Sequence, residues 1–290
     1  MNRRRLFLAA AAAAGCGVAL IAAAHLLPGA GTTPRAAQAG KASHHRVKGR
    51  EGFLDFALTP RRPGNLLMRE DTVGSSVQGR RIELRQYGDP ALEGELLVFG
   101  CIHGDECAAQ HLRPLTPITA FCPDWVSDIY MVGNLNPDGR ALGTRLNGRG
   151  VDLNRNFPAG WMPIGSRGDP QFSGPKPLSE PEARLATRIV RRLRPEVTIW
   201  FHQHYAPRPM VRAWSRSVPA ARRFARLAGL PFKRIPWPAG TAPNWQNHRF
   251  PGSASFVVEL PRGKLPDGRR ALLERALLRL GRSVARVSED

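Results

Sequence analysis

Short apolar runs that end abruptly at polar residues constrain the fold of this chain more than any other feature. Four such runs occupy residues 96–99, 128–134, 197–201 and 256–260. Each is too short for an isolated helix and has the length of a buried strand. Further strands are expected at 80–87 and 232–235, and helices at 106–113, 179–194, 220–227 and 268–287. Strands that alternate with helices indicate an α/β fold.

Three of the predicted helices carry more detailed signals. Pro114 is expected to end the first one early. Residues 179–182, Ser-Glu-Pro-Glu, have the pattern of a capping box that opens a basic amphipathic helix. In the last helix, one apolar face is expected to be buried, and it comprises Leu272, Leu273, Ala276 and Leu280.

Residues 1–27 have the pattern of a targeting segment. Arg4 and Arg5 precede Leu-Phe-Leu in the manner of a twin-arginine export signal, and an apolar run over 6–27 follows. Residues 37–39, Ala-Gln-Ala, would suit a signal peptidase. Two alternatives stay open: an uncleaved membrane anchor through residues 6–27, and a lipoprotein signal ending at Cys16. All three predict export, to a secreted, periplasmic or cell-wall-associated location. Residues 28–50 lack periodicity and predict a flexible linker, which leaves 51–290 as the folded domain.

The charge of the chain bears on its partners. Lys and Arg number 43 against 23 acidic residues, for a formal net charge of +20. Such a charge favours polyanions, among them acidic cell-wall polymers. The basic residues are scattered, without the interleaved aromatics of a nucleic-acid stacking platform, so no nucleic-acid partner is expected. An Arg- and Ala-rich composition is equally consistent with genomic bias alone.

The cysteines do not form a complete disulfide framework. Beyond the N-terminal segment the chain has three, Cys101, Cys107 and Cys122. Cys107 and Cys122 are a candidate pair, with two buried thiols as the alternative.

Residues able to bind a metal follow the apolar runs. His103 and Glu106 stand three residues apart just after the first run, at the carboxyl end of a predicted strand, where ligands of open α/β sheets gather. Zinc accepts such a mixture of nitrogen and oxygen ligands. His202 ends another run, and His204 follows on the same side of an extended chain. His202 is the preferred candidate because the apolar run stops there, and His204 is then a pocket residue.

Two more features belong with this group. Residues 135–174 form a long polar stretch of the length that usually has a function, with Asn-Pro-Asp-Gly at 136–139 and Gly-Val-Asp-Leu-Asn-Arg-Asn-Phe at 150–157. Glu259 lies inside the last apolar run. A carboxylate there is costly unless it is paired or faces a cavity. The alternative is an outward side chain on a half-exposed strand.

In this order, the motifs resemble the zinc carboxypeptidase family, and in particular the bacterial murein peptide amidases. The resemblance covers about residues 70–265. It implies a single-domain three-layer α/β/α sandwich with a mixed, mostly parallel twisted sheet, and a catalytic domain over 51–290. It also implies one Zn²⁺ per chain, held by His103, Glu106 and His202.

The resemblance further assigns roles to the surrounding residues. Asp152 would orient His103, and Arg145 would stabilise the oxyanion. Asn154 and Arg155 would hold the terminal carboxylate of the substrate, and Glu259 would be the general base. The chain departs from the pancreatic members over residues 236–241, where it has no counterpart of their mobile Tyr.

The sequence therefore predicts an exported zinc metallocarboxypeptidase or amidase that cleaves a C-terminal amide bond in a peptide or muropeptide. Peptidoglycan stem peptides are the candidate substrate. Two alternatives are a zinc deacylase acting on small N-acyl amino acids and a non-catalytic cell-wall binding protein. Contact with a membrane is expected only through an uncleaved N-terminal segment.

Overall fold

The structure is a computed structural model that describes residues 67–88, 95–114, 128–203 and 208–285, all within the compact unit Arg50–Asp290. The predicted signal segment and linker, as well as Cys122 and His204, lie outside the described residues. None of the helices that the structure describes is long and apolar enough to cross a membrane.

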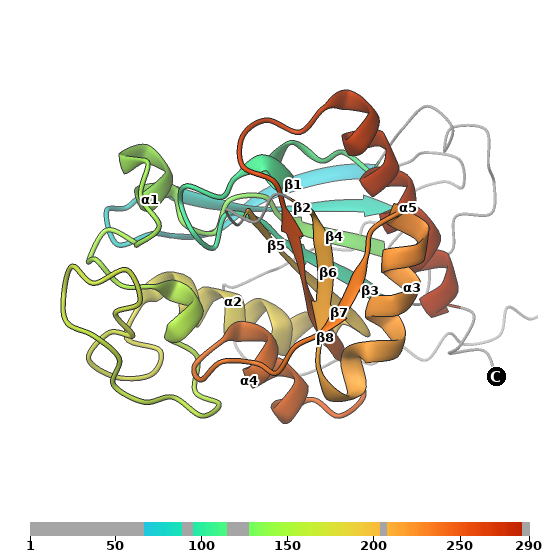
Figure 1. Ribbon diagram of the computed structural model, residues 1–290. Coiled ribbons are helices and arrows are strands. Elements are labelled where there is room, and N and C mark those ends of the chain that lie inside the picture. Colours follow the sequence, from blue (N-terminus) through green and yellow to red (C-terminus); the bar gives the residue numbers. More distant parts are fainter. Residues whose placement is uncertain (1–66, 89–94, 115–127, 204–207, 286–290) are drawn as a thin grey trace, which may run out of the picture. The chain divides into compact units, whose positions relative to one another are not determined.

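An eight-stranded sheet forms the middle of this unit (Figure 1). Its strands are β1 Leu67–Ser75, β2 Arg81–Gly88, β3 Glu95–Phe99, β4 Asp128–Val132, β5 Val197–Gln203, β6 Met210–Ala213, β7 Phe232–Arg234 and β8 Ala254–Leu260. They are ordered β1-β2-β4-β3-β5-β8-β6-β7. The central strands β4, β3, β5 and β8 are parallel to one another, whereas β1, β2 and β6 introduce antiparallel pairings. The prediction of a mixed, mostly parallel sheet is confirmed.

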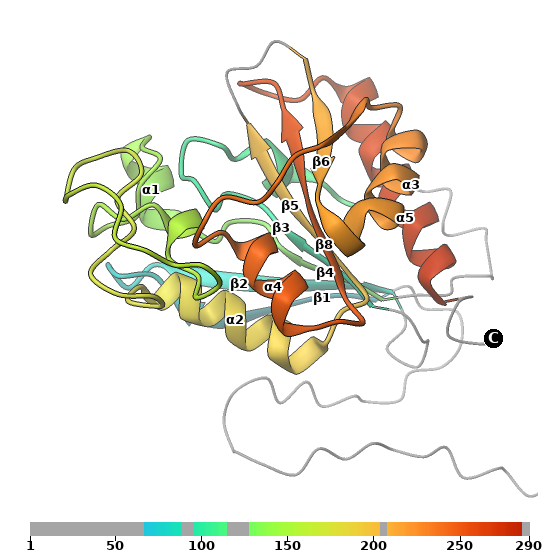
Figure 2. The ribbon, with the colours of Figure 1, turned by 60° about the horizontal axis from the view of Figure 1, so that its bottom comes forward.

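Helices cover both faces of the sheet. They are α1 Pro137–Leu142, α2 Pro181–Leu193, α3 Val218–Ala228, α4 Ala242–Arg249 and α5 Asp267–Ala285. Helices α3 and α5 lie together on one face, and α2 and α4 lie on the other (Figures 1 and 2). The predicted three-layer sandwich is therefore confirmed.

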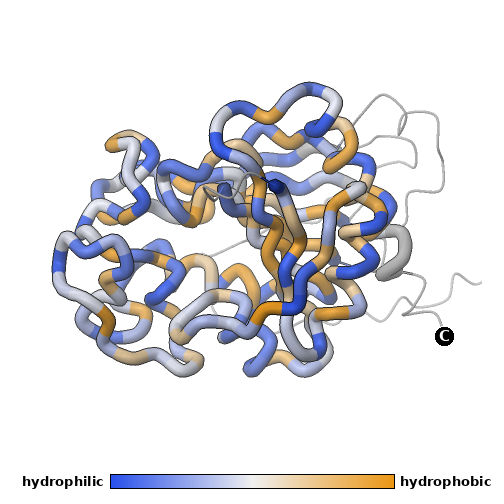
Figure 3. Tube along the Cα trace, viewed as in Figure 1, coloured by the Kyte–Doolittle hydropathy of each residue, from blue (hydrophilic) through white to orange (hydrophobic). Residues whose placement is uncertain are grey.

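The alternation of side chains along β3 explains why its run is apolar throughout. Leu96 and Val98 are buried in the core shared with α3 and α5, whereas Leu97 and Phe99 are buried in the core shared with α2 and α4. A strand with both faces covered needs apolar residues at every position. Figure 3 shows the hydrophobic residues concentrated along these central strands.

Several local expectations are wrong. The predicted helix at 106–113 is only a short 3-10 helix, Ala108–His111, whose first N–H, that of Ala108, donates to the Gln203 side chain at 2.7 Å. In the last helix, Leu273 is fully buried but Leu272 is 37% exposed, since its direction on the helix differs by about 100°.

The expected capping box also does not form. The residue before α2 is Glu180, and its side chain makes no capping hydrogen bond. Instead, the Glu182 carboxylate accepts a hydrogen bond from the backbone N–H of Val77, 2.9 Å away and far off in the sequence. The side chains expected to cap the helix therefore bond to residues distant in the sequence: Glu182 accepts from Val77, and Ser179 accepts from the Asn156 side chain.

Candidate metal centre

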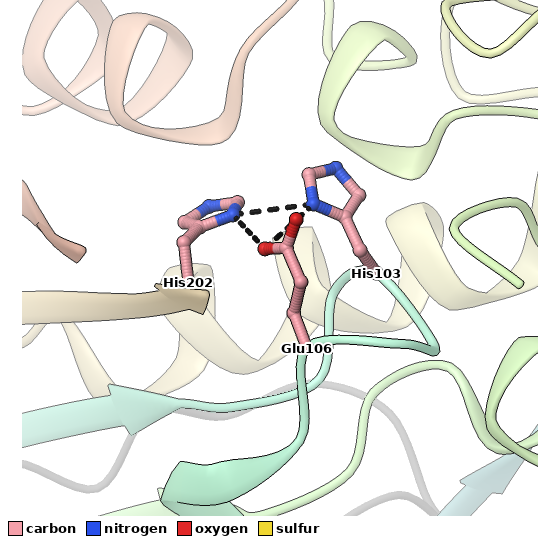
Figure 4. A group of neighbouring side chains, drawn as sticks. All are labelled: His103, Glu106 and His202. Carbon is pink, nitrogen blue, oxygen red and sulfur yellow. Dashed lines mark hydrogen bonds and ion pairs between the residues drawn. The ribbon is translucent and has the colours of Figure 1, made fainter. Parts of the chain in front are cut away.

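Three side chains converge at the carboxyl ends of β3 and β5. Nδ1 of His202 lies 2.8 Å from Oε2 of Glu106, Nδ1 of His103 lies 3.0 Å from the same oxygen, and the two nitrogens are 3.2 Å apart (Figure 4). All three residues are buried. Because β3 and β5 are adjacent parallel strands, residues 99 positions apart in the sequence meet at one sheet edge.

Asp152 and Arg145 surround this cluster. Nε2 of His103 lies 3.0 Å from an oxygen of Asp152, so the second ring nitrogen is oriented by a carboxylate. Arg145 donates to the other Asp152 oxygen at 2.8 Å and reaches Glu106 at 3.3 Å. The guanidinium is thus held at the edge of the cluster, where it can meet negative charge on a bound group.

The electrostatics of the cluster follow from burial and charge. Burial would lower the pKa of His103, but the flanking carboxylates of Asp152 and Glu106 outweigh it and raise that pKa to about 9. Burial would raise the pKa of Glu106, yet His103 and His202 hold it far below the ordinary value. Burial likewise opposes ionisation of Asp152, but His103 first and Arg145 next lower its pKa. Both carboxylates are therefore ionised at neutral pH.

Glycines allow the backbone that holds the ligands to approach its support. A Cβ on Gly104 would overlap with the backbone of Gly139, and a Cβ on Gly139 would overlap with the Leu146 carbonyl and the Asn136 side chain. The Asn136 side chain also accepts the Gly139 N–H at 2.9 Å. The Asn-Pro-Asp-Gly motif is thus a support on which the loop carrying His103 and Glu106 rests.

A disulfide closes that loop. Cys101 is bonded to Cys107, so the covalent ring includes both His103 and Glu106. The expected disulfide between Cys107 and Cys122 is therefore wrong. The alternative, in which Cys107 is a buried thiol, is wrong as well. Spacing along the chain did not indicate the observed pair, because only the turn after β3 brings residues six positions apart to a Cα separation of 4.5 Å.

A cavity of about 540 Å³ opens above the cluster. Beside the three clustered residues, its walls include Arg145, Asn154, Arg155 and Glu259. Arg155 donates to the Asn154 carbonyl at 2.9 Å, and the Asn154 side chain accepts the Ala242 N–H at 3.0 Å. These bonds fix the two residues in the wall.

Glu259 reaches the same cavity from β8. It stands opposite His202 in the register of β5 with β8, and its side chain is 13% exposed. Its carboxylate lies 3.6 Å from Arg212. The structure therefore brings together the eight residues to which the resemblance gives a role, and Glu259 faces a cavity rather than solvent.

Sequence reasoning missed several other residues of this site. Gln203 holds three segments together: it accepts the Ala108 N–H at 2.7 Å and donates to the carbonyls of Pro261 and Gly263 at 2.7 and 2.8 Å. Arg212 and Trp237 also line the cavity. Residues 210–213, Met-Val-Arg-Ala, are too few to have given a periodic signal for β6 or for Arg212.

The donor set fits zinc. Two imidazole nitrogens and one carboxylate oxygen converge, the arrangement of a catalytic zinc site that leaves a position open. The orienting carboxylate on His103 is the usual second partner of a zinc-bound histidine.

Comparison with known proteins also points to zinc. Residues 64–207 match the family model described as zinc carboxypeptidase. Murein peptide amidase A of Escherichia coli (strain K12) is 35% identical over 129 residues, which are 38% of this chain and 49% of that protein. Carboxypeptidase B of Astacus astacus is 27% identical over 140 residues, covering 39% of this chain and 46% of its own length. The chain thus spans about half the length of these relatives.

Solved structures share the fold. Carboxypeptidase A from Helicoverpa armigera superposes with a TM-score of 0.60 at 19% identity, over 77% of this chain and 70% of that one. Murein-tripeptide amidase from Escherichia coli O157 superposes with a TM-score of 0.53 at 23% identity, over 79% of this chain and 94% of that one.

Proposed function

We propose, from the premise that this chain belongs to the zinc carboxypeptidase family over residues 64–207, that it is an exported zinc-dependent peptidase. It hydrolyses an amide bond next to a free carboxylate, and its substrates are peptidoglycan stem peptides. One observation carries the proposal: a candidate zinc triad, a carboxylate suited to general-base work and an arginine suited to a carboxylate share one cavity.

Each residue has a definite task in this reaction. His103, Glu106 and His202 would hold a zinc ion. Bound there, the ion would supply Lewis-acid chemistry for the scissile carbonyl and for a water molecule at neutral pH. Glu259 accepts a proton from the attacking water and delivers it to the leaving nitrogen. Arg145, held by Asp152 at 2.8 Å, meets the negative charge that develops on the carbonyl oxygen.

Recognition of the substrate falls to the other wall of the cavity. Arg155 presents a planar fork of donors to the carboxylate beside the scissile bond, and Asn154 stands next to it. The basic charge of the chain favours association with an anionic cell wall. The similarity to a murein peptide amidase supports the choice of stem peptides, whose carboxylates lie on D-centres and diamino acids.

The test compares each peptide with a form in which only the carboxylate next to the scissile bond is amidated. Amidation should lower kcat/KM by ~10²-fold or more, since charge-assisted hydrogen bonds each contribute about 1.5–3 kcal/mol. Arg155→Ala should remove most of that difference. Equal cleavage of both forms by zinc-loaded protein would contradict the assigned carboxylate site.

The choice of substrate has its own measurement. Mass spectrometry should detect faster cleavage of a γ-D-glutamyl–diamino acid bond than of a plain L-peptide C-terminus. A preference for the plain L-peptide would place the chain with ordinary carboxypeptidases. Hydrolysis of N-acyl amino acids without peptide cleavage would identify a deacylase instead.

A further inference from the structure

Arg212 lines the cavity and lies on a strand that carries none of the residues assigned to the reaction. It lies on β6, opposite Val257 of β8, while the neighbouring Val211 is buried in the core on the α3 and α5 side. Because side chains alternate along a strand, Arg212 points to the other face, where Val257 and Glu259 also line the cavity. Its side chain is 22% exposed.

The guanidinium of Arg212 has one charged neighbour and an aromatic ring beside it, but no hydrogen bond to the described residues. It lies 3.6 Å from the Glu259 carboxylate, beyond hydrogen-bond distance, and 5.6 Å from the centre of the Trp237 ring. Its Nε is buried, and within the described part of the chain it has no hydrogen-bond partner. Among the same residues, none of its five N–H donors has an acceptor at hydrogen-bond distance. A buried donor left in this state is costly unless a ligand supplies the acceptor.

The other arginines of the cavity differ in this respect. Four arginines line it, against the carboxylates of Asp105, Glu106 and Glu259. Arg145 is bound by Asp152 at 2.8 Å, and Arg262 is bound by Asp105 at 3.0 Å. Arg155 donates only to a backbone carbonyl and, at 3.5 Å, to Gln171, as far as the described residues extend. Two guanidinium groups, those of Arg155 and Arg212, therefore retain donors for an anionic ligand.

These two groups also act on each other. The pKa of Arg155 is lowered by burial first; the charge of Asp152 opposes this shift, and the positive charges of Arg145 and Arg212 add to it. Two cations that repel each other across a small cavity are both stabilised by a ligand that carries two negative charges. A ligand with two carboxylates can place one on each of them.

We propose that Arg212 is a specificity-determining residue, which binds a second carboxylate on the residue that the reaction releases. The inference rests on the proposed function, with Arg155 holding the carboxylate beside the scissile bond. Trp237 and Val257 line the same cavity and would flank the apolar stem between the two carboxylates of the ligand. The substrate class is a peptide whose last residue is an acidic amino acid or a diamino acid with two carboxylates.

The test uses two matched pairs of peptides on the zinc-loaded full chain. One pair ends in glutamate or glutamine, and the other ends in diaminopimelate or lysine, which lacks only the second carboxylate. The charged member of at least one pair should have a kcat/KM ~10- to 100-fold higher than its neutral partner, the range expected for charge-assisted hydrogen bonds. The pair with the larger ratio identifies the class of released residue.

Variants then show whether Arg212 causes the ratio of kcat/KM between the charged and neutral peptides. Arg212→Met removes the charge while keeping most of the stem, so the ratio should fall to about one. Arg262→Met removes the same charge from the same cavity, but that arginine is held by Asp105, so the ratio should persist. Persistence of the ratio in Arg212→Met, or absence of any ratio in the unmodified protein, would overturn the proposal. A role limited to positioning Glu259 predicts instead that both members of each pair slow equally.

A binding measurement separates this proposal from the proposed function. Calorimetry with free glutamate against glutamine, and with diaminopimelate against lysine, requires no turnover. Tighter binding of a dicarboxylate that Arg212→Met abolishes supports the second-carboxylate site even if no peptide is cleaved. Failure to cleave any peptide would contradict the proposed function alone, whereas equal affinity within both pairs would contradict the role of Arg212.

Discussion

His103 is the residue whose chemistry depends most on its neighbours. Its ring lies between the carboxylates of Asp152 and Glu106, 3.0 Å from each, and these raise its pKa to about 9 against the opposing effect of burial. Without a metal the ring is therefore protonated at neutral pH. A zinc ion has to replace that proton, because only a neutral imidazole nitrogen is a ligand.

Zinc binding should accordingly depend on pH. Below about 9 the apparent affinity should fall by about tenfold each time the pH drops by one, because one proton must leave His103 for each zinc bound. Above the pKa of His103 in the folded protein, His103 no longer makes the zinc affinity depend on pH. Competition with a chelator between about pH 6 and 8 measures the slope, and an affinity that is flat over this range would contradict it.

Ligand variants provide the control for that measurement. His202→Ala removes a nitrogen 2.8 Å from Glu106 and should lose zinc by elemental analysis. His204→Ala should retain most of it, since His202 and not His204 is assigned as the ligand. Equal loss in both variants would mean that the assignment is wrong.

Glu259→Gln tests the general base. The substitution keeps the shape of the side chain but cannot accept a proton, so turnover should fall by ~10²–10⁴-fold while the zinc content stays the same. A stopped assay on zinc-loaded protein measures the drop. Near-normal turnover in this variant would exclude Glu259 as the base.

The strands of the sheet carry different chemistry at their two ends. The carboxyl ends of β3 and β5 lead to the candidate metal ligands, whereas at the start of β3 Glu95 pairs in register with Asp128 of β4. One oxygen of Glu95 is buried and has no hydrogen-bond partner among the residues that the structure describes. Burial first, and then the charges of Asp128 and Glu196, raise the pKa of Glu95 to about 8.

This pKa predicts a loss of stability with rising pH. Below the ordinary value of 4.5, Glu95 is protonated in both the folded and the unfolded chain and costs nothing. Between 4.5 and about 8 the unfolded chain ionises while the folded one retains its proton, so the free energy of unfolding falls. Above about 8 the cost is constant.

Glu95→Gln should remove that loss. Its free energy of unfolding should exceed that of the unmodified protein by ~1–3 kcal/mol at about pH 8, because a pKa that differs by one between the folded and unfolded chains corresponds to about 1.4 kcal/mol. At about pH 5 the difference should be small. Urea unfolding at the two pH values measures it, and an equal difference at both would rule out titration of Glu95 as the cause.

Export concerns the chain as a whole, because a twin-arginine signal acts on the complete precursor. The described residues contain a buried disulfide next to the candidate metal ligands, which is consistent with an oxidising compartment. The candidate signal lies at Arg4 and Arg5.

Replacing both Arg4 and Arg5 by lysine keeps the charge and should leave the precursor in the cytoplasm. Fractionation of cells that express the variant and the unmodified protein provides the measurement. Undiminished export of the variant would favour a general secretory route.

The sequence by itself determined the class of fold and eight of the residues that the structure gathers at the candidate site. Runs with both faces apolar predict buried strands whatever their partners are, and the ordered motifs specify the residue types that the chemistry requires. Asn136 and Gly139 were readable as a motif, although their supporting role was not. Strand β6 and helix α4 escaped prediction because four and eight residues respectively give too little periodicity to recognise.

Only the tertiary structure decided how those residues act together. Three contacts depend on how the chain returns to the sheet. They are the disulfide between Cys101 and Cys107, the ion pair of Arg212 with Glu259, and the hydrogen bond from the Val77 N–H to the Glu182 carboxylate. Propensity and motif act over a few residues along the chain. Charge, burial and hydrogen bonding act across space, so which donors of the cavity remain available to a substrate is settled only when the strands are placed side by side.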